Sequence, residues 1–200
     1  MRILLTNDDG IDGPGLQALY EAVADLPDVE VTVIAPDRNW SISGHNKTMD
    51  RPLRVSEITW YNGMMAFSTD GTPADCVSLA GLGLMPEAPD LVMSGINTGP
   101  NLGDEVTYSG TVAAAMEAHI AGIPALAFSC NAYIDHNFDA AARFARRMVT
   151  LFQKTRRGEE GGLALTSDLL LNINAPSLAF DEIGGIEITR QGRRIYKDEL

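Results

Sequence analysis

Short apolar runs alternate along the chain with longer segments in which apolar residues recur at helical spacing. Such short runs are typical of strands buried in a parallel sheet, and the longer segments predict amphipathic helices. Buried strands are predicted at residues 3–5, 30–34, 91–93, 125–128 and 169–173, an edge strand at 183–189, and helices at 14–26, 72–84, 109–121 and 138–154. This order predicts an α/β fold with a mostly parallel sheet and helices on both faces.

Three segments interrupt the alternation. Residues 53–60 and 64–68 predict two strands joined by a tight turn at Asn62-Gly63. Residues 38–50 are polar, and a connection of this length is often functional. Residues 95–103 are rich in glycine and asparagine and are predicted to form a loop. The two loops are therefore candidate binding segments.

Length and composition fit one globular domain. The chain has 200 residues, 45% of them hydrophobic, which is enough for a sizeable core. Its net charge of −12 argues against a nucleic-acid polymer or an anionic membrane as partner, because both require a basic surface. A small phosphorylated ligand is compatible with this charge if a metal ion or oriented backbone amides supply the positive field.

Several features bear on location. No run approaches the roughly 20 apolar residues of a membrane-spanning helix, and we expect no signal peptide because a strand begins the chain. Cys76 and Cys130 are predicted to be buried thiols rather than a disulfide. The last four residues, 197–200, match an ER-retention signal, which we interpret as a coincidence in a cytoplasmic protein.

An acidic pair, Asp8 and Asp9, follows the first predicted strand. In an open α/β sheet, ligands bind outside the carboxyl ends of the strands. Two adjacent carboxylates repel each other and resist burial, and a hard divalent cation such as Mg, Mn or Ca relieves both costs. The alternative is a solvated turn, because Asp, Asn and Gly are common turn residues.

Three more polar segments are expected at the same edge of the sheet, at residues 37–45, 94–101 and 108–111. A serine or asparagine from the first two can complete a set of oxygen ligands. The run Ser109-Gly110-Thr111 opens a helix, where free N–H groups, hydroxyls and the positive end of the dipole favour an anion. A metal beside an anion site indicates phosphate ester chemistry.

Each of these residues also has a structural interpretation. Asn97 fits a turn, and Ser109 fits a helix N-cap. His45 is either a solvated loop residue or a general acid, and Trp40 either stacks on a base or anchors its loop. His119 and His136 are interpreted as structural. No serine-hydrolase elbow, Walker loop or CxxC motif is present.

Together the segments resemble the SurE family, the survival-protein-E nucleotidases. The resemblance is carried by ILLTNDDGI at 3–11, APDRN at 35–39 with Ser41, GTPADC at 71–76, SGINTGPNLGD at 94–104 and YSGTVAAAME at 108–117. It implies a Rossmann-like three-layer αβα sandwich and a metal-dependent 5′-nucleotidase that hydrolyses nucleoside monophosphates. Activity on 3′-nucleotides and short polyphosphate is a further expectation.

The resemblance also implies site residues. It places one divalent cation (Mg, Mn or Co) on Asp8, Asp9, Ser41 and Asn97, with the two aspartates catalytic, and the substrate phosphate near Asn101, Ser109, Gly110 and Thr111. It implies a homodimer or homotetramer. The rival interpretation is non-catalytic, a Mg-binding receiver-like or nucleotide-sensing domain. A receiver requires an aspartate where this chain has Gly95.

Two features depart from the family pattern. Trp40 stands where basic or polar residues are usual, which alters the substrate side of the expected site. Family members also run further, through an extended hairpin and a C-terminal helix. We therefore expect a SurE-like domain at residues 1–190, with residues 191–200 as the start of an extension that is cut short.

Overall fold

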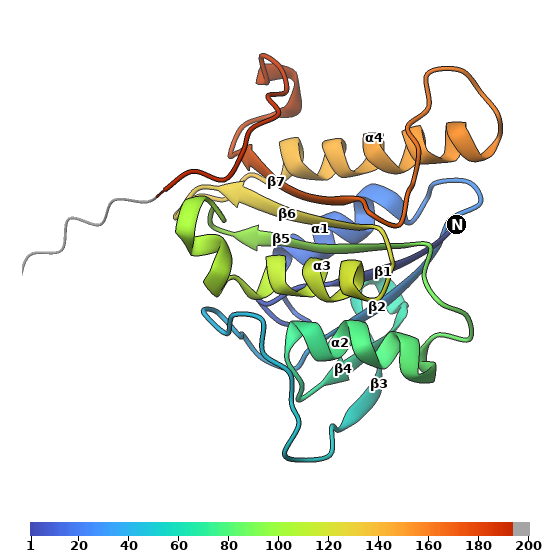
Figure 1. Cartoon of the computed structure of the whole chain (residues 1–200), viewed down its shortest axis with the longest axis vertical. Helices are drawn as coiled ribbons and strands as arrows, with labels where there is room; N and C mark the ends of the chain where they lie inside the picture. The colour runs from blue at the N-terminus through green and yellow to red at the C-terminus, as the bar shows by residue number, and fades with distance from the viewer. Residues whose placement is uncertain (194–200) are drawn as a thin grey trace, which may run out of the picture.

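The protein is a seven-stranded, mostly parallel sheet between two layers of helices, as seen in a computed structural model that describes residues 1–193 (Figure 1). The spatial order is β3-β4-β2-β1-β5-β6-β7, and β3 alone runs antiparallel to its neighbour. The strands are β1 Arg2–Thr6, β2 Glu30–Pro36, β3 Val55–Thr59, β4 Met65–Thr69, β5 Leu91–Thr98, β6 Ala125–Asn131 and β7 Leu170–Pro176. The expected three-layer αβα sandwich is confirmed.

Four α-helices cover the sheet: α1 Pro14–Val23, α2 Pro73–Leu79, α3 Gly110–Ile120 and α4 Asp139–Arg156. Helices α1 and α4 pack together on one face, and α2 and α3 pack together on the other (Figure 1). Shorter helical turns are η1 Tyr61–Gly63, η2 Ala80–Leu84, η3 Gly103–Tyr108 and η4 Phe180–Glu182. Among residues 1–193 no helix combines the length and apolarity needed to cross a membrane.

Strand β1 is buried on both faces of the sheet, which explains the unbroken apolar run at its centre. Ile3, Leu4 and Leu5 are all fully buried. Ile3 and Leu5 belong to the core cluster under α1 and α4, and Leu4 belongs to the cluster under α2 and α3. A strand covered on both faces needs apolar side chains at every position. Both cysteines are free and buried, as predicted.

The predicted hairpin is present as β3 and β4. Its turn places Asn62 and Gly63 at φ 54° and 78°, in the left-handed region that these two residues tolerate best. The Trp60 indole, at the base of the turn, donates a hydrogen bond of 2.8 Å to the carbonyl oxygen of Ile11. The hairpin is thereby fastened to the segment that follows the acidic pair.

Two sequence-based predictions of secondary structure are wrong. The segment at 95–98 continues strand β5 through a bulge instead of opening a loop. Gly95 permits this, because a Cβ there would lie 2.3 Å from the carbonyl oxygen of Phe128. The predicted edge strand at 183–189 does not form: these residues pair with no strand, and Ile188 is 97% exposed. The ER-retention match and most of the expected extension fall at 194–200, outside the described residues.

Candidate functional site

Asp8 lies at the carboxyl edge of the sheet, two residues past the end of β1, and is only 4% exposed. Its Oδ1 accepts a hydrogen bond from the hydroxyl of Thr111, in the first turn of α3. Burial, assisted by the charge of Asp9 and opposed by the hydrogen bond from Thr111, raises the pKa of Asp8 to about 6. Asp8 is therefore a buried carboxylate without a cationic partner among residues 1–193.

Asp9 is half-buried and is oriented by strand β5. The Thr98 hydroxyl donates to its Oδ1 at 3.0 Å, and the Thr98 backbone N–H donates to its Oδ2 at 3.2 Å. The Asn39 amide adds a longer contact of 3.4 Å to Oδ1. These neutral donors fix the carboxylate without cancelling its charge. Thr98 did not stand out in the sequence, because it lies inside a segment that was predicted as a loop.

Ser41 reaches the site on the long loop after β2, as the sequence predicts for this segment. The loop is joined to β1 where the Trp40 backbone N–H donates to the carbonyl oxygen of Asp8 at 2.7 Å. One residue further, the Ser41 N–H donates to the Asn39 side chain at 2.7 Å, and Asn39 also contacts Asp9. The Ser41 hydroxyl is exposed and has no hydrogen-bond partner among residues 1–193.

Asn97 approaches from the bulged end of β5. Its Nδ2 donates to the carbonyl oxygen of Gly99 at 2.8 Å, which fixes the amide and directs Oδ1 away from that contact. Within residues 1–193, Oδ1 accepts no hydrogen bond. The amide nitrogen of Asn97 thus serves the turn, as the structural interpretation expects, while a ligand role for its oxygen stays a prediction.

The start of α3 packs directly on Asp8. A Cβ at Gly110 would lie 2.7 Å from the Asp8 Cβ and 3.0 Å from the Ser43 hydroxyl, so glycine lets the helix, the loop and the aspartate meet. Ser109 is the N-cap, and its hydroxyl oxygen accepts from the Val112 N–H at 3.1 Å. Its hydroxyl proton stays free to donate. The first N–H groups of a helix have no intrahelical acceptors, and such an end favours a negative charge.

Asn101 and Thr111 are less available than the sequence suggested. The Asn101 amide donates to Ser129 at 2.8 Å, and its backbone is held by Asn172 and Asn174 on β7. Thr111 is fully buried, with its hydroxyl bound to Asp8. Both side chains already have partners, so among the predicted phosphate contacts Ser109 and the backbone at Gly110 offer the free donors.

A carboxylate absent from the predicted site, Glu117 on α3, anchors the long loop. It contacts Lys47 Nζ at 2.7 Å, His45 Nε2 at 2.9 Å and the Ser78 hydroxyl at 3.1 Å. Burial alone would raise the pKa of Glu117, but these hydrogen bonds together hold it below its ordinary value. His45 is therefore neither simply solvated nor placed against the acidic pair; it fastens the loop.

The donor set fits a hard divalent cation. Asp8 and Asp9 supply two carboxylates, Ser41 an unpartnered hydroxyl and Asn97 a free amide oxygen, all of them oxygen donors. Among residues 1–193 no three or more His, Cys, Asp or Glu side chains form a cluster that could hold a metal ion, and two of the four donors named here are Ser and Asn.

Comparison with known proteins identifies the family of the chain. The family model described as survival protein SurE matches residues 3–198. A 5′-nucleotidase SurE from Chloroflexus aggregans is 49% identical over 100% of this chain and 76% of its own length, and one from Desulforudis audaxviator is 49% identical over 100% and 74%. A crystal structure of the SurE protein from Aquifex aeolicus superposes with a TM-score of 0.83 at 44% identity, covering 98% of this chain and 75% of that one. The chain belongs to the survival protein SurE family.

Proposed function

We infer that the protein is a 5′-nucleotidase that hydrolyses nucleoside monophosphates to nucleoside and phosphate with the help of one divalent cation. Relatives that match its whole length carry the name 5′-nucleotidase SurE. The observation that supports the metal is the buried Asp8 beside Asp9, two carboxylates with no cationic partner among residues 1–193.

The residues of the site have three separate roles in the proposed reaction: holding the cation, binding the phosphate and orienting the carboxylates. Asp8, Asp9, Ser41 and Asn97 would hold the cation, which when bound polarises the phosphoryl group and activates water. The Ser109 hydroxyl and the first N–H groups of α3 bind the phosphate oxygens and stabilise charge that shifts onto them. Thr111 and Thr98 keep the two carboxylates in fixed orientations. No covalent intermediate is required, because water is the nucleophile in the proposed reaction.

The receiver-like alternative has less support. Its phosphoacceptor aspartate would stand at Gly95, which here has φ +124° and lies against the Phe128 carbonyl. Turnover of 3′-nucleotides and short polyphosphate, assembly as a homodimer or homotetramer, and a cytoplasmic location stay predictions from the sequence.

Phosphate release from nucleoside 5′- and 3′-monophosphates, measured with Mg, Mn or Co, tests the proposal. We expect EDTA to stop phosphate release, a divalent cation to restore it, and the far-UV helical signal to stay constant, because the core is large enough to fold without metal. Release that persists in EDTA would exclude the metal. An absence of release with every metal and nucleotide would favour the sensing alternative.

A further inference from the structure

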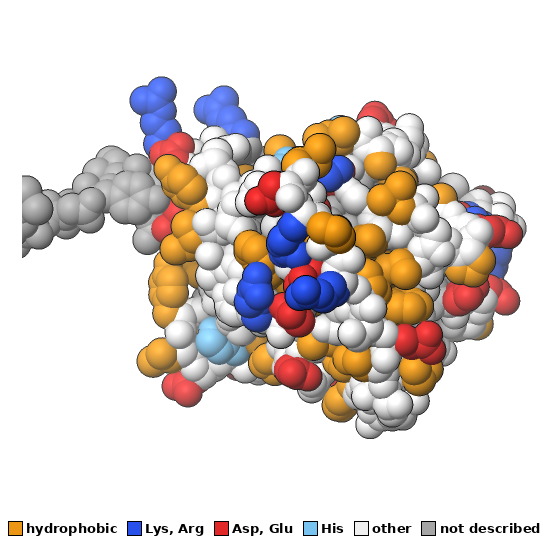
Figure 2. Space-filling view, turned by 90° about the horizontal axis from the view of Figure 1, so that it is seen from below, with side chains coloured by type: hydrophobic (Ala, Val, Ile, Leu, Met, Phe, Trp, Pro, Cys, Tyr) orange, Lys and Arg blue, Asp and Glu red, His pale blue; other side chains and the backbone are white. Residues whose placement is uncertain are grey.

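A pocket of about 380 Å³ opens on the long loop after β2 and is lined by Trp40 and residues 46–51. Its volume is within the range of about 300–1,000 Å³ that small-molecule sites occupy. The phosphate machinery described above does not use it. Figure 2 shows that the face carrying this loop and β3 presents basic and acidic side chains side by side among hydrophobic ones.

The pocket adjoins the metal and phosphate site at one end. The Trp40 N–H is bonded to the Asp8 carbonyl, so this wall begins at the acidic pair. Lys47, which also lines the pocket, is held by Glu117, which lies two turns, or about 10 Å, along α3 from Gly110. A substrate whose phosphate is bound at the start of α3 can therefore extend into the pocket.

We propose that this pocket binds the nucleobase of the substrate and that the Trp40 indole is the surface on which the base stacks. The inference rests on the proposed function and deepens it, because it assigns the part of the substrate that the metal and helix do not contact.

The charges of the pocket favour a neutral ring over a second phosphate. Its two cations already have partners: Lys47 is paired with Glu117, and Arg51 contacts Asp70 at 2.8 Å. Asp50, on the same wall, has no ion pair among residues 1–193 and adds a negative charge. Asn46 and Thr48 contribute an amide and a hydroxyl. Such a wall repels anions and offers hydrogen bonds to the amino and ring N–H groups of a base.

The Trp40 indole is held in place from within its own loop. The Arg38 guanidinium lies 4.8 Å from the centroid of the Trp40 ring and supports it by a cation–π contact. The indole Nε1 is buried and has no hydrogen-bond acceptor among residues 1–193. Trp40 as a whole is only half-buried and lines the pocket, so a ligand in the pocket can contact the ring. Stacking on the ring is tolerant of base identity, because every base has a π-face.

The first experiment compares kcat/KM for AMP with kcat/KM for ribose 5-phosphate, which lacks a base. Trp40→Ala is expected to lower the ratio of the two by about 5- to 150-fold, the range that base–aromatic stacking supplies. Trp40→Phe keeps an aromatic face and is expected to retain most of the preference. Ile42→Ala removes an exposed apolar side chain from the same loop and is the matched control, with a ratio like the wild type. Equal losses for both substrates in Trp40→Ala would overturn the proposal.

The second experiment needs no turnover. The chain has two tryptophans, and Trp60 is buried and bonded to Ile11, so a fluorescence change on adding adenosine should come from Trp40. We expect adenosine to change the emission of the wild type and leave that of Trp40→Phe unaltered. No change in the wild type would overturn the base pocket even if AMP is hydrolysed. A change without any phosphate release would keep the pocket and reject the nucleotidase.

Discussion

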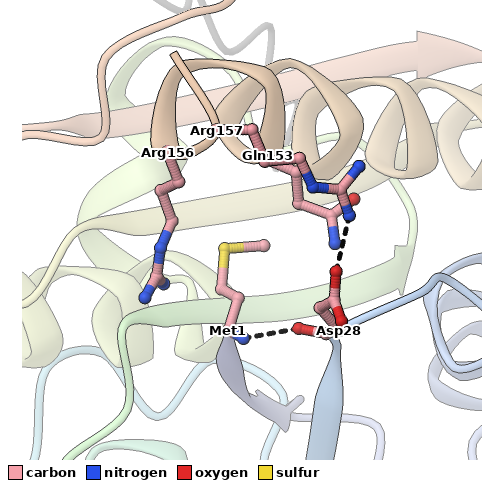
Figure 3. Close-up of a pocket in the computed structure, with 5 residues that line it drawn as sticks. All are labelled: Met1, Asp28, Gln153, Arg156 and Arg157. Atoms are coloured by element: carbon pink, nitrogen blue, oxygen red, sulfur yellow. Dashed lines mark hydrogen bonds and ion pairs between the residues drawn. The ribbon is translucent and has the colours of Figure 1, made fainter. Parts of the chain in front are cut away.

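At the amino edge of the sheet, carboxylates are paired with cations, whereas at the carboxyl edge Asp8 and Asp9 have no cationic partner among residues 1–193. Figure 3 shows the amino edge, where a small pocket lies between Met1, Asp28 and the end of α4. There Arg157 contacts Asp28 at 2.8 Å, and the N-terminal ammonium donates to the Asp28 carbonyl at 2.5 Å. Close by, Asp90 is bound by Arg2 and Arg156.

The pKa of Asp90 at the amino edge and that of Asp8 at the carboxyl edge are shifted in opposite directions. Burial on its own would raise the pKa of Asp90, but hydrogen bonds from the Arg2 backbone and the Arg156 guanidinium outweigh it and lower that pKa. At Asp8 burial dominates, and the pKa rises to about 6. A carboxylate whose charge is satisfied by the protein stabilises the fold, and one left unsatisfied costs stability and is available to a ligand.

The largest expected effect is a loss of activity when an aspartate at the carboxyl edge is replaced, with no such loss at the amino edge. Asp8→Asn and Asp9→Asn should each lower kcat/KM by at least about 10³-fold, because each removes a charged ligand of a cation worth several kcal/mol to the transition state. Asp90→Asn is the control at the amino edge and should leave steady-state kinetics near the wild type. Near wild-type turnover of either site variant at limiting metal would remove that aspartate from the ligand set.

Ser109 tests whether the start of α3 does more than begin a helix. Ser109→Ala should lower kcat/KM by about 10- to 10³-fold through loss of a phosphate donor and cost about 1 kcal/mol through loss of the cap. Ser109→Gly should retain most of the capping stability and be as inactive as the alanine variant. Full activity of the glycine variant would reduce Ser109 to its structural role.

In the metal-free protein, replacing Asp8 and replacing Asp90 should change the free energy of unfolding in opposite directions. Since the pKa of Asp8 rises from 3.8 to about 6 on folding, the folded state keeps a proton that the unfolded chain loses. That stabilisation is present below the lower value and lost as the pH rises through 6, so at neutral pH Asp8 costs up to about 3 kcal/mol. In EDTA, denaturant unfolding should find Asp8→Asn more stable than the wild type at neutral pH, with the difference vanishing near about pH 4.

Asp90→Asn should behave in the reverse way. Its folded pKa is lowered, so the stabilisation it gives is present at neutral pH and is lost as the pH falls through that lowered value. We expect the variant to be less stable at neutral pH by about 1–2 kcal/mol. If both variants shift stability in the same direction, the contrast between the two edges is wrong.

The smallest effect concerns the anchor of the long loop. Glu117→Gln keeps the shape of the side chain and removes the charge that holds Lys47 and His45. Because the loop carries Ser41, we expect Mn²⁺ affinity to fall by about 10- to 100-fold, as for other outer-shell partners, measured by calorimetry. Lys47→Ala in the Glu117→Gln background should add little, since both remove the same contact. Unaltered Mn²⁺ affinity in Glu117→Gln would mean that the loop is held elsewhere.

The periodicity of the sequence was enough to predict most of the fold, because the spacing of apolar residues in a strand or helix reflects which of its faces are buried. It failed at 95–98, where glycine and asparagine look like a loop; only the packing of Gly95 on Phe128 reveals a strand. It failed again at 183–189, where alternation resembles a strand but the sheet supplies no partner.

The sequence was enough to name candidate site residues, but it could not reveal the hydrogen bonds that orient them. Asp8 and Asp9 stand together in the sequence and signal their role by adjacency. The contacts that orient them, from Thr111 and Thr98, join residues about a hundred positions apart, and composition cannot encode such pairs. The same holds for Glu117, which looks like one more charge on a helix until the fold places His45 and Lys47 against it.

The position of β1 in the middle of the sheet has a consequence for synthesis. Its neighbour β5 begins at Leu91, 85 residues after β1 ends at Thr6. At about 5–20 residues per second, the ribosome needs roughly 4–17 s to supply that neighbour. During this interval the edge of β1 that will pair with β5 is open, with Ile3, Leu4 and Leu5 at its centre, and the candidate ligand Asn97 has not yet been made. Until β5 is made, β1 can pair only with β2, which begins at Glu30, so its other edge stays unpaired throughout this interval.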